Sequence, residues 1–89
     1  MSEWHVYIVQ CSDGSLYTGI TKNIDDRISQ HNAGQGAKYT RSRRPVVLVY
    51  QEVAENHGAA LRRENAIRRL RPEMKRVLVA EFSNHLRSE

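Results

Sequence analysis

The sequence predicts an α/β domain in which a three-stranded antiparallel sheet is flanked by helices. Apolar, β-branched runs at residues 4–11 and 16–21 are separated by turn residues and predict a hairpin, and a third run at residues 46–51 predicts one more strand. Segments with helical periodicity lie between and after these runs. Because 89 residues are too few for two cores, we expect one domain over residues 1–82 and a flexible tail over residues 83–89.

The turn between the first two strands decides which side chains share a face of the sheet. A two-residue turn would place Tyr7 and Tyr17 on opposite faces. A three-residue loop with Gly14 in the left-handed conformation pairs Cys11 with Ser15 and brings both tyrosines to one face. The other face then collects an apolar set, Trp4, Val6, Ile8, Leu16 and Ile20. This cleaner separation favours the three-residue loop.

A short helix is expected after the hairpin. Asn23 is a suitable N-cap residue, and Ile24 and Ile28 share one face of a helix. Gly34 supplies a C-terminal stop, which gives a helix of about three turns. Residues 34–45 then form a loop rich in basic residues.

The rest of the chain predicts a strand and two helices. Residues 46–51 are an unbroken apolar, β-branched run, which indicates a strand buried on both faces. A second helix is expected over residues 57–70. Pro72 suits the first turn of a third helix, which we expect to end near Phe82.

The chain is basic, with 14 Lys and Arg residues, 10 Asp and Glu residues and a net charge of +4. Thirteen basic and six acidic residues lie within residues 22–76, and residues 38–44 hold four positive charges with no acid. This concentration of charge favours a polyanion as partner, and nucleic acid is the leading class. A membrane surface is a weaker alternative, because no segment is a long basic helix with a massed apolar face.

Cysteine content and hydropathy indicate a reducing compartment. Cys11 is the single cysteine, so neither an intramolecular disulfide nor a thiolate zinc cluster is expected. The first residues lack a basic stretch followed by an apolar one, and no apolar run approaches the ~18 residues needed to cross a bilayer. We therefore expect a cytoplasmic protein with no membrane partner and no small-molecule cofactor.

Five polar residues occur in a distinctive order along the predicted elements. Tyr7 lies in the tripeptide Val-Tyr-Ile, and Tyr17 opens the tripeptide Tyr-Thr-Gly ten residues later. Arg27 and His31 are four residues apart on the first helix, so they project from one side of it, and Glu64 lies on the second helix. This order resembles the GIY-YIG nuclease family, in particular its small stand-alone bacterial members.

The resemblance covers residues 4–82 and implies a metal-dependent endonuclease that hydrolyses phosphodiester bonds in DNA. Tyr7 looks like the family's general base, which requires its pKa to fall from about 10; a nearby Arg27 and a divalent metal would push it that way. Tyr17 would bind the phosphate or the attacking water, or exchange roles with Tyr7. Arg27 would clamp the scissile phosphate, with a surface ion pair to a carboxylate as the alternative. His31 would assist proton transfer or hold a phosphate.

Glu64 is expected to face inward, because it falls between Ala60 and Ile67 on the helical wheel. A carboxylate in that position needs a partner. The partner is either an arginine or, as the resemblance implies, Mg²⁺ (or Mn²⁺) whose other ligands are water and substrate phosphate. Several family members carry an asparagine further on, where this chain has no match at residues 76–79. Activity is then low or independent of that residue, or Lys75 or the adjacent arginine fills the space.

The basic loop is expected to grip a nucleic-acid backbone. It interleaves one aromatic side chain with four cations, and the hydroxyls of Thr40 and Ser42 are suited to phosphate oxygens. The residues expected to contact nucleic acid are Lys38, Tyr39, Arg41, Arg43 and Arg44. The alternative is a charge run that is merely solvated.

No segment resembles an element that reads bases in a groove, so we expect selectivity for DNA structure rather than sequence. Flaps, nicks, branches and single-stranded regions are the expected substrates, and a repair-related role belongs to this hypothesis. RNA is the alternative substrate. The rival function is a nucleic-acid-binding module that has the same fold and basic surface but little or no catalytic turnover.

Overall fold

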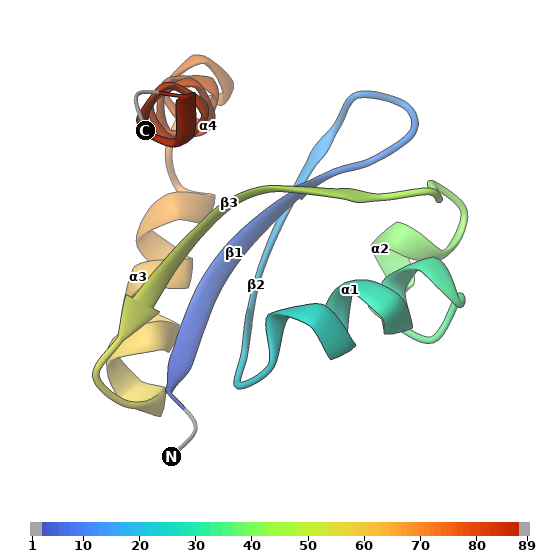
Figure 1. Cartoon of the computed structure of the whole chain (residues 1–89), viewed down its shortest axis with the longest axis horizontal. Helices are drawn as coiled ribbons and strands as arrows, with labels where there is room; N and C mark the ends of the chain where they lie inside the picture. The colour runs from blue at the N-terminus through green and yellow to red at the C-terminus, as the bar shows by residue number, and fades with distance from the viewer. Residues whose placement is uncertain (1–2, 88–89) are drawn as a thin grey trace.

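The computed structural model describes residues 3–87, and the side chains of residues 3–84. The predicted fold class is confirmed, since a three-stranded antiparallel sheet in the order β2-β1-β3 carries helices on both sides (Figure 1). The elements are, in chain order, β1 (Trp4–Gln10), β2 (Leu16–Thr21), α1 (Ile24–Asn32), α2 (Lys38–Arg41), β3 (Val47–Ala54), α3 (His57–Arg68) and α4 (Pro72–Arg87).

The β1–β2 hairpin has the predicted register. Tyr7 is opposite Gly19, and the amide of Cys11 donates to the carbonyl of Ser15 at 2.8 Å. Gly14 closes the three-residue loop with a φ of 85°, a left-handed conformation that suits glycine. The register therefore places Tyr7 and Tyr17 on one face of the sheet, as predicted.

The most deeply buried strand is β1, which lies between the other two. Its residues Val6, Tyr7, Ile8 and Val9 are each at most 1% exposed. The prediction that the apolar run of β3 is buried on both faces is wrong, since β3 is an edge strand in which Val47 is 61% exposed. Hydrophobicity marks both runs as strands but does not say which of them lies in the middle.

Each face of the sheet packs on a different helix. Val6 and Ile8 on one face contact Ala60 and Ile67 of α3. On the opposite face, Tyr7 and Val9 pack with partly buried apolar residues of α1, Ile24 and Ile28. Figure 1 shows α1 and α3 on opposite sides of the sheet. The side chains of Tyr7 and Tyr17 therefore face α1, whereas Glu64 belongs to the helix on the other side.

The first helix begins and ends as predicted. The side chain of Asn23 caps α1 by accepting from the amide of Asp26 at 3.0 Å. After the last turn, Gly34 adopts a φ of 82° and its amide donates to the carbonyl of His31. This local chemistry holds His31 in the last turn of α1, where its side chain points to the sheet and is fully buried.

The basic loop contains a helical turn that the sequence did not predict. Residues 38–41 form α2, whose only buried side chain is that of Thr40. Both ends of the loop are tied together by Asn32, which accepts from the amide of Val46 at 2.7 Å and donates to its carbonyl at 3.1 Å. A single side chain thus links the end of α1 to the start of β3.

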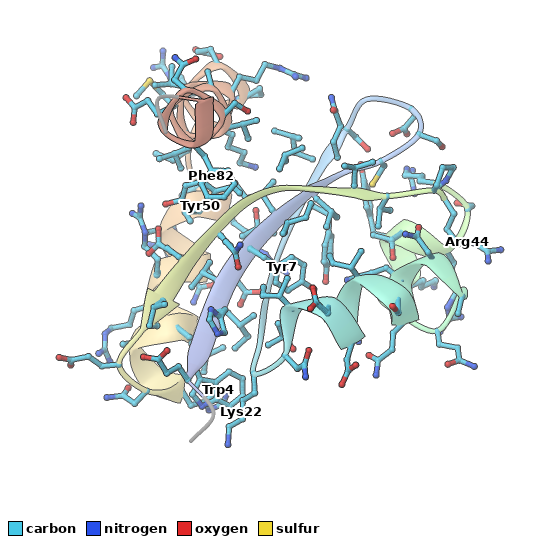
Figure 2. All side chains as sticks on the ribbon, in the orientation of Figure 1. Trp4, Tyr7, Lys22, Arg44, Tyr50 and Phe82 are labelled. Atoms are coloured by element: carbon cyan, nitrogen blue, oxygen red, sulfur yellow. The ribbon has the colours of Figure 1, made fainter. Side chains whose placement is uncertain are left out.

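The last helix is longer than predicted. It packs against β3, and the rings of Tyr50 and Phe82 lie 5.6 Å apart with an edge-on orientation (Figure 2). It ends at Arg87 rather than near Phe82, so residues 83–87 are helical where the sequence predicted a tail. Residues 88 and 89 lie outside the described part of the chain. Within the described part, none of the helices has the length and apolar content that a membrane span requires.

Candidate active site

A buried chain of hydrogen bonds connects β1, α1 and α2. The hydroxyl of Tyr7 lies 2.8 Å from Nε2 of His31, and Nδ1 of His31 lies 2.8 Å from the hydroxyl of Thr40. The hydroxyl of Thr40 donates its proton to the carbonyl of Ala37 at 3.0 Å, so it must accept from Nδ1 of His31. Nε2 is then the unprotonated nitrogen, and Tyr7 donates to it.

Arg27 lies against the same phenolic oxygen. Its Nε donates to the oxygen of Tyr7 at 3.4 Å, and its Nη1 donates to Oε1 of Gln30 at 3.0 Å. The alternative that Arg27 is used in a surface ion pair is therefore not what these contacts show. The oxygen of Tyr7 thus has a permanent cation on one side and the basic nitrogen of His31 on the other.

The pKa of Tyr7 is raised above 10.0, mainly because the phenol is buried. Arg27 acts in the opposite direction, as predicted, whereas Tyr17 and Glu64 raise the pKa further. In the metal-free protein, the cost of burying a phenolate therefore exceeds the effect of this one cation. Tyr7 thus keeps its proton at neutral pH, and the acceptor placed to receive that proton is His31. The fall in pKa expected with a divalent metal also bound stays a prediction.

The pKa of His31 is lowered from its usual 6.5, first by burial and then by the positive charge of Arg27. A neutral imidazole agrees with the hydrogen bonds, which leave Nε2 free to accept. His31 is thus in the protonation state that a base for Tyr7 requires.

We predict that acid destabilises the fold through His31. Because its folded pKa lies below its unfolded value near 6.5, the stability due to neutral His31 is complete above that value and is lost as the pH falls through the folded pKa. Thermal unfolding of the wild type and His31→Gln between about pH 8 and about pH 5 measures this, with a smaller loss of Tm expected for the variant. Parallel curves for the two proteins would refute the role of His31.

Two glycines make room for this pair. A Cβ atom on Gly19 would lie 2.5 Å from the hydroxyl of Tyr7, and one on Gly36 would lie 2.2 Å from Nδ1 of His31. Gly19 therefore lets the phenol of Tyr7 cross over β2. Sequence reasoning missed Gly36 and the buried Thr40; the only signal was that both fall within the loop that follows His31.

Tyr17 borders the same pair and extends it toward α2. Its ring lies edge-on to that of His31 at 5.6 Å and stacks on Tyr39 at 6.0 Å with an angle of 17°. The guanidinium of Arg43 covers the ring of Tyr39 at 4.0 Å. The structure thus brings the two predicted catalytic tyrosines together with an aromatic residue of the basic loop.

Glu64 is linked to the edge strand β2 through Arg68. Its side chain is 12% exposed, and its Oε2 lies 3.3 Å from Nη2 of Arg68 one turn later. The same Nη2 donates at 3.2 Å to the carbonyl of Thr18, which lies on β2. The carboxylate faces inward as predicted, and its partner in the structure is an arginine, which was one of the two alternatives.

A pocket of about 240 Å³ opens beside these groups. It is lined by Leu16, Tyr17, Thr18, Tyr39, Arg68 and Lys75. A second pocket of about 220 Å³ shares Lys75 and continues to Arg76 at the start of α4. Arg76, the first of the residues where family members carry an asparagine, and the preceding Lys75 therefore place two cations next to the site.

The predicted nucleic-acid-binding residues divide into two groups. Lys38 and Arg41 are exposed on α2. Arg43 is used within the protein, since it pairs with Asp13 at 3.1 Å and donates to the carbonyl of Tyr39.

Arg44 is also used within the protein, because it donates to the carbonyls of Arg41 and Asn32. The expectation that Thr40 contacts phosphate is wrong, because its hydroxyl is buried and engaged with His31.

The residues present fit a divalent metal of the magnesium type. Within the described residues, no three His, Cys, Asp or Glu side chains gather into a site that would enclose an ion. Glu64 offers a single inward carboxylate near the open pocket and close enough to raise the pKa of Tyr7. One carboxylate with water and substrate oxygens is a usual ligand set for Mg²⁺.

The fold and the site fit a nuclease-type domain, because a tyrosine–histidine pair, an arginine at the phenolic oxygen and an isolated carboxylate are groups that phosphodiester hydrolysis can use. A family model described as the GIY-YIG catalytic domain matches residues 3–76. The chain belongs to the GIY-YIG family. Members of this family act on nucleic acid and generally use divalent metal ions.

Its relatives are small proteins of similar length. The chain is 60% identical over 77 residues to UPF0213 protein DP2720 of Desulfotalea psychrophila, covering 85% of this chain and 70% of the relative. It is 52% identical over 81 residues to UPF0213 protein SH2523 of Staphylococcus haemolyticus, and the match covers 91% of this chain and 99% of the relative.

Two solution structures share the fold. UPF0213 protein BH0048 of Bacillus halodurans is similar with a TM-score of 0.57 and 42% identity, covering 88% of this chain and 83% of that one. Protein EF2693 of E. faecalis is similar with a TM-score of 0.60 and 34% identity, and the match covers 93% of this chain and 88% of that one.

Proposed function

We propose that this protein is a divalent-metal-dependent endonuclease that hydrolyses phosphodiester bonds in DNA. The observation that carries the proposal is the buried contact between Tyr7 and the unprotonated Nε2 of His31, with Arg27 on the phenolic oxygen. A buried tyrosine held only for packing needs one partner for its hydroxyl, whereas Tyr7 has both a neutral histidine and a cation at its oxygen.

Proton transfer follows the hydrogen-bond chain. As water attacks phosphorus, its proton passes to the oxygen of Tyr7 while the phenolic proton passes to Nε2 of His31. This relay avoids a free phenolate, which the raised pKa of Tyr7 disfavours. Thr40 keeps the imidazole in the required tautomer by accepting from Nδ1. Afterwards Nε2 of His31 returns its proton to the oxygen of Tyr7 as that oxygen releases the water-derived proton to solvent, a reversal that the low pKa of the buried imidazole favours.

Cations around the site bind the phosphates. Arg27 stabilises the scissile phosphate, for which its planar fork is suited. Arg68 and Lys75 line the pocket beside Tyr17 and bind neighbouring phosphates. Glu64, with water, would hold a divalent ion, and that ion when bound would supply positive charge for the leaving oxygen.

The basic surface favours backbone contacts over base reading. Lys38, Tyr39, Arg41, Arg43 and Arg44 are proposed to lie along the nucleic acid, with Lys38 and Arg41 in direct phosphate contact because they are exposed. Affinity should therefore fall steeply with salt. DNA with flaps, nicks, branches or single-stranded regions is the proposed substrate, with a repair-related role in the cytoplasm.

A second candidate function is a nucleic-acid-binding module with little or no turnover. The observation that favours it is the lack of the family's asparagine at residues 76–79. Lys75 and Arg76 occupy this part of the surface. Two cations in place of a neutral amide would strengthen binding without supplying a group for the reaction.

We expect the wild type to cleave DNA only with a divalent metal and Tyr7→Phe to lose at least about 10²-fold in rate, because the relay lacks its oxygen. The measurement is cleavage of labelled single-stranded, duplex, nicked, flap and branched DNA with Mg²⁺, Mn²⁺ or EDTA. The matched control is Tyr50→Phe, since Tyr50 is also a strand tyrosine with a bonded hydroxyl, but its partner is Glu52.

Three results would count against the proposal. Binding of every DNA substrate without cleavage would support the second candidate function, a nucleic-acid-binding module. Cleavage at equal rates in Tyr7→Phe and the wild type would show that the reaction does not use the proton relay through Tyr7. Equal cleavage of linear duplex and all branched forms would show that the protein does not select its substrate by DNA structure.

A further inference from the structure

Arg68 lies where the carboxylate, the sheet edge and the pocket meet. Its Nη2 is 3.3 Å from Glu64 and 3.2 Å from the carbonyl of Thr18. Its guanidinium lies 6.0 Å from the ring centre of Tyr17 and forms part of the pocket lining. One side chain therefore touches both the group suited to a metal and the space suited to a phosphate.

The guanidinium competes with a metal ion for Glu64. An arginine and a divalent cation are both attracted to the same carboxylate, and they repel each other at short range. Glu64 is 12% exposed, so its oxygens are reached from few directions, and one of these directions is taken by Arg68. In the free protein the carboxylate is thus already partly neutralised.

The contacts that hold Arg68 are easily given up. Nη2 alone serves both Glu64 and Thr18, at distances above 3 Å, instead of forming a bidentate fork. The side chain is 50% exposed, which makes the ion pair weak. A phosphate in the adjoining pocket, where Lys75 adds a second cation, offers Arg68 a stronger partner.

We propose that Arg68 is a positioning residue that keeps Glu64 occupied until substrate phosphate draws its guanidinium away. Metal and nucleic acid then bind cooperatively, because each favours the arrangement in which Arg68 has left Glu64. This inference rests on the proposed function, in which Glu64 holds the metal. It adds that the metal site is opened by the substrate.

The first test is Mn²⁺ binding to the free protein, followed by electron paramagnetic resonance. We expect Arg68→Ala to bind Mn²⁺ about three- to tenfold more tightly than the wild type, because a competing cation has gone. Arg68→Lys, which keeps the charge, should fall between them. Arg69→Ala is the matched control, since Arg69 is exposed beside Arg68 and its loss removes the same charge.

The second test measures coupling. In the Tyr7→Phe background, where cleavage is blocked, a DNA oligonucleotide should tighten Mn²⁺ binding by about fivefold or more after subtraction of Mn²⁺ bound by DNA alone. With Arg68→Ala added, the enhancement should fall below about twofold, because the inhibitory contact is already absent. Circular dichroism of each variant checks that the fold is retained.

The outcomes separate the two proposals. If Glu64→Ala binds Mn²⁺ as the wild type does, Glu64 is not the metal ligand, and both the metal role proposed for Glu64 and the inference about Arg68 fail. If binding depends on Glu64 but Arg68→Ala is no tighter than Arg69→Ala, only the inference about Arg68 is overturned. Equal enhancement by DNA with and without Arg68 would overturn it as well.

Discussion

Glu64→Ala is expected to abolish metal-dependent cleavage, with a loss of at least about 10³-fold, since a metal ion contributes several kcal/mol to such a transition state. Affinity for DNA measured in EDTA should be unchanged or higher, because a negative charge is removed from a basic surface and no metal contributes to binding. This combination distinguishes an enzyme from a binding module, which has no activity to lose. The measurements are product formation over time and fluorescence anisotropy with labelled DNA.

The fold should survive this substitution. The ion pair of Glu64 with Arg68 is half-exposed on the arginine side and is an i,i+4 helix pair, which typically contributes about 0.3–0.5 kcal/mol. Glu55→Ala is the matched control, because Glu55 is exposed just before α3 and its loss changes the net charge equally. If Glu64→Ala cleaves DNA at the wild-type rate with Mg²⁺, Glu64 has no role in the reaction.

Gly36→Ala is expected to produce the largest loss of stability among small substitutions, about 1–3 kcal/mol or more. Its Cβ would lie 2.2 Å from Nδ1 and 2.9 Å from Cα of His31, so backbone as well as side chain must move. The bond between His31 and Thr40 would be disrupted, which leaves buried polar groups without partners. A fall in Tm of at least about 4 °C is expected for a domain of this size.

Gly58→Ala provides the control for this effect. A Cβ at Gly58 would meet only Arg62 and Asn56, each at 3.4 Å, which is ordinary contact. Because Gly58 lies in α3, alanine should stabilise the helix by up to about 1 kcal/mol. If Gly36→Ala melted at the temperature of the wild type, the tight fit around His31 would be disproved.

Features set by neighbouring residues were predictable from the sequence. The three-residue loop and its register depend on Gly14 and on the alternation of side chains in two adjacent strands, and both were predicted correctly. The limits of α1 depend on Asn23 and Gly34, which act within one helical turn. The approach of Tyr7 to His31 then follows, since the register and the helix phase each direct one side chain inward.

Features set by distant residues were not predictable. The edge position of β3 depends on which neighbour β1 pairs with, and hydrophobicity alone does not encode that choice. Arg43 was predicted to contact nucleic acid, but in the fold it pairs with Asp13, which lies 30 residues away in the sequence. The rise in the pKa of Tyr7 caused by burial of its phenol became apparent only with the packed structure.

The central position of β1 also has a consequence for how the chain reaches its native state. During synthesis the most buried strand leaves the ribosome before the other two, and β2 covers one of its edges soon afterwards through a local hairpin. The opposite edge waits for β3, which ends at Ala54. Until then the nascent hairpin exposes an unpaired strand edge that other chains are able to join. Protection of that edge by the ribosome or a chaperone would matter most in this interval.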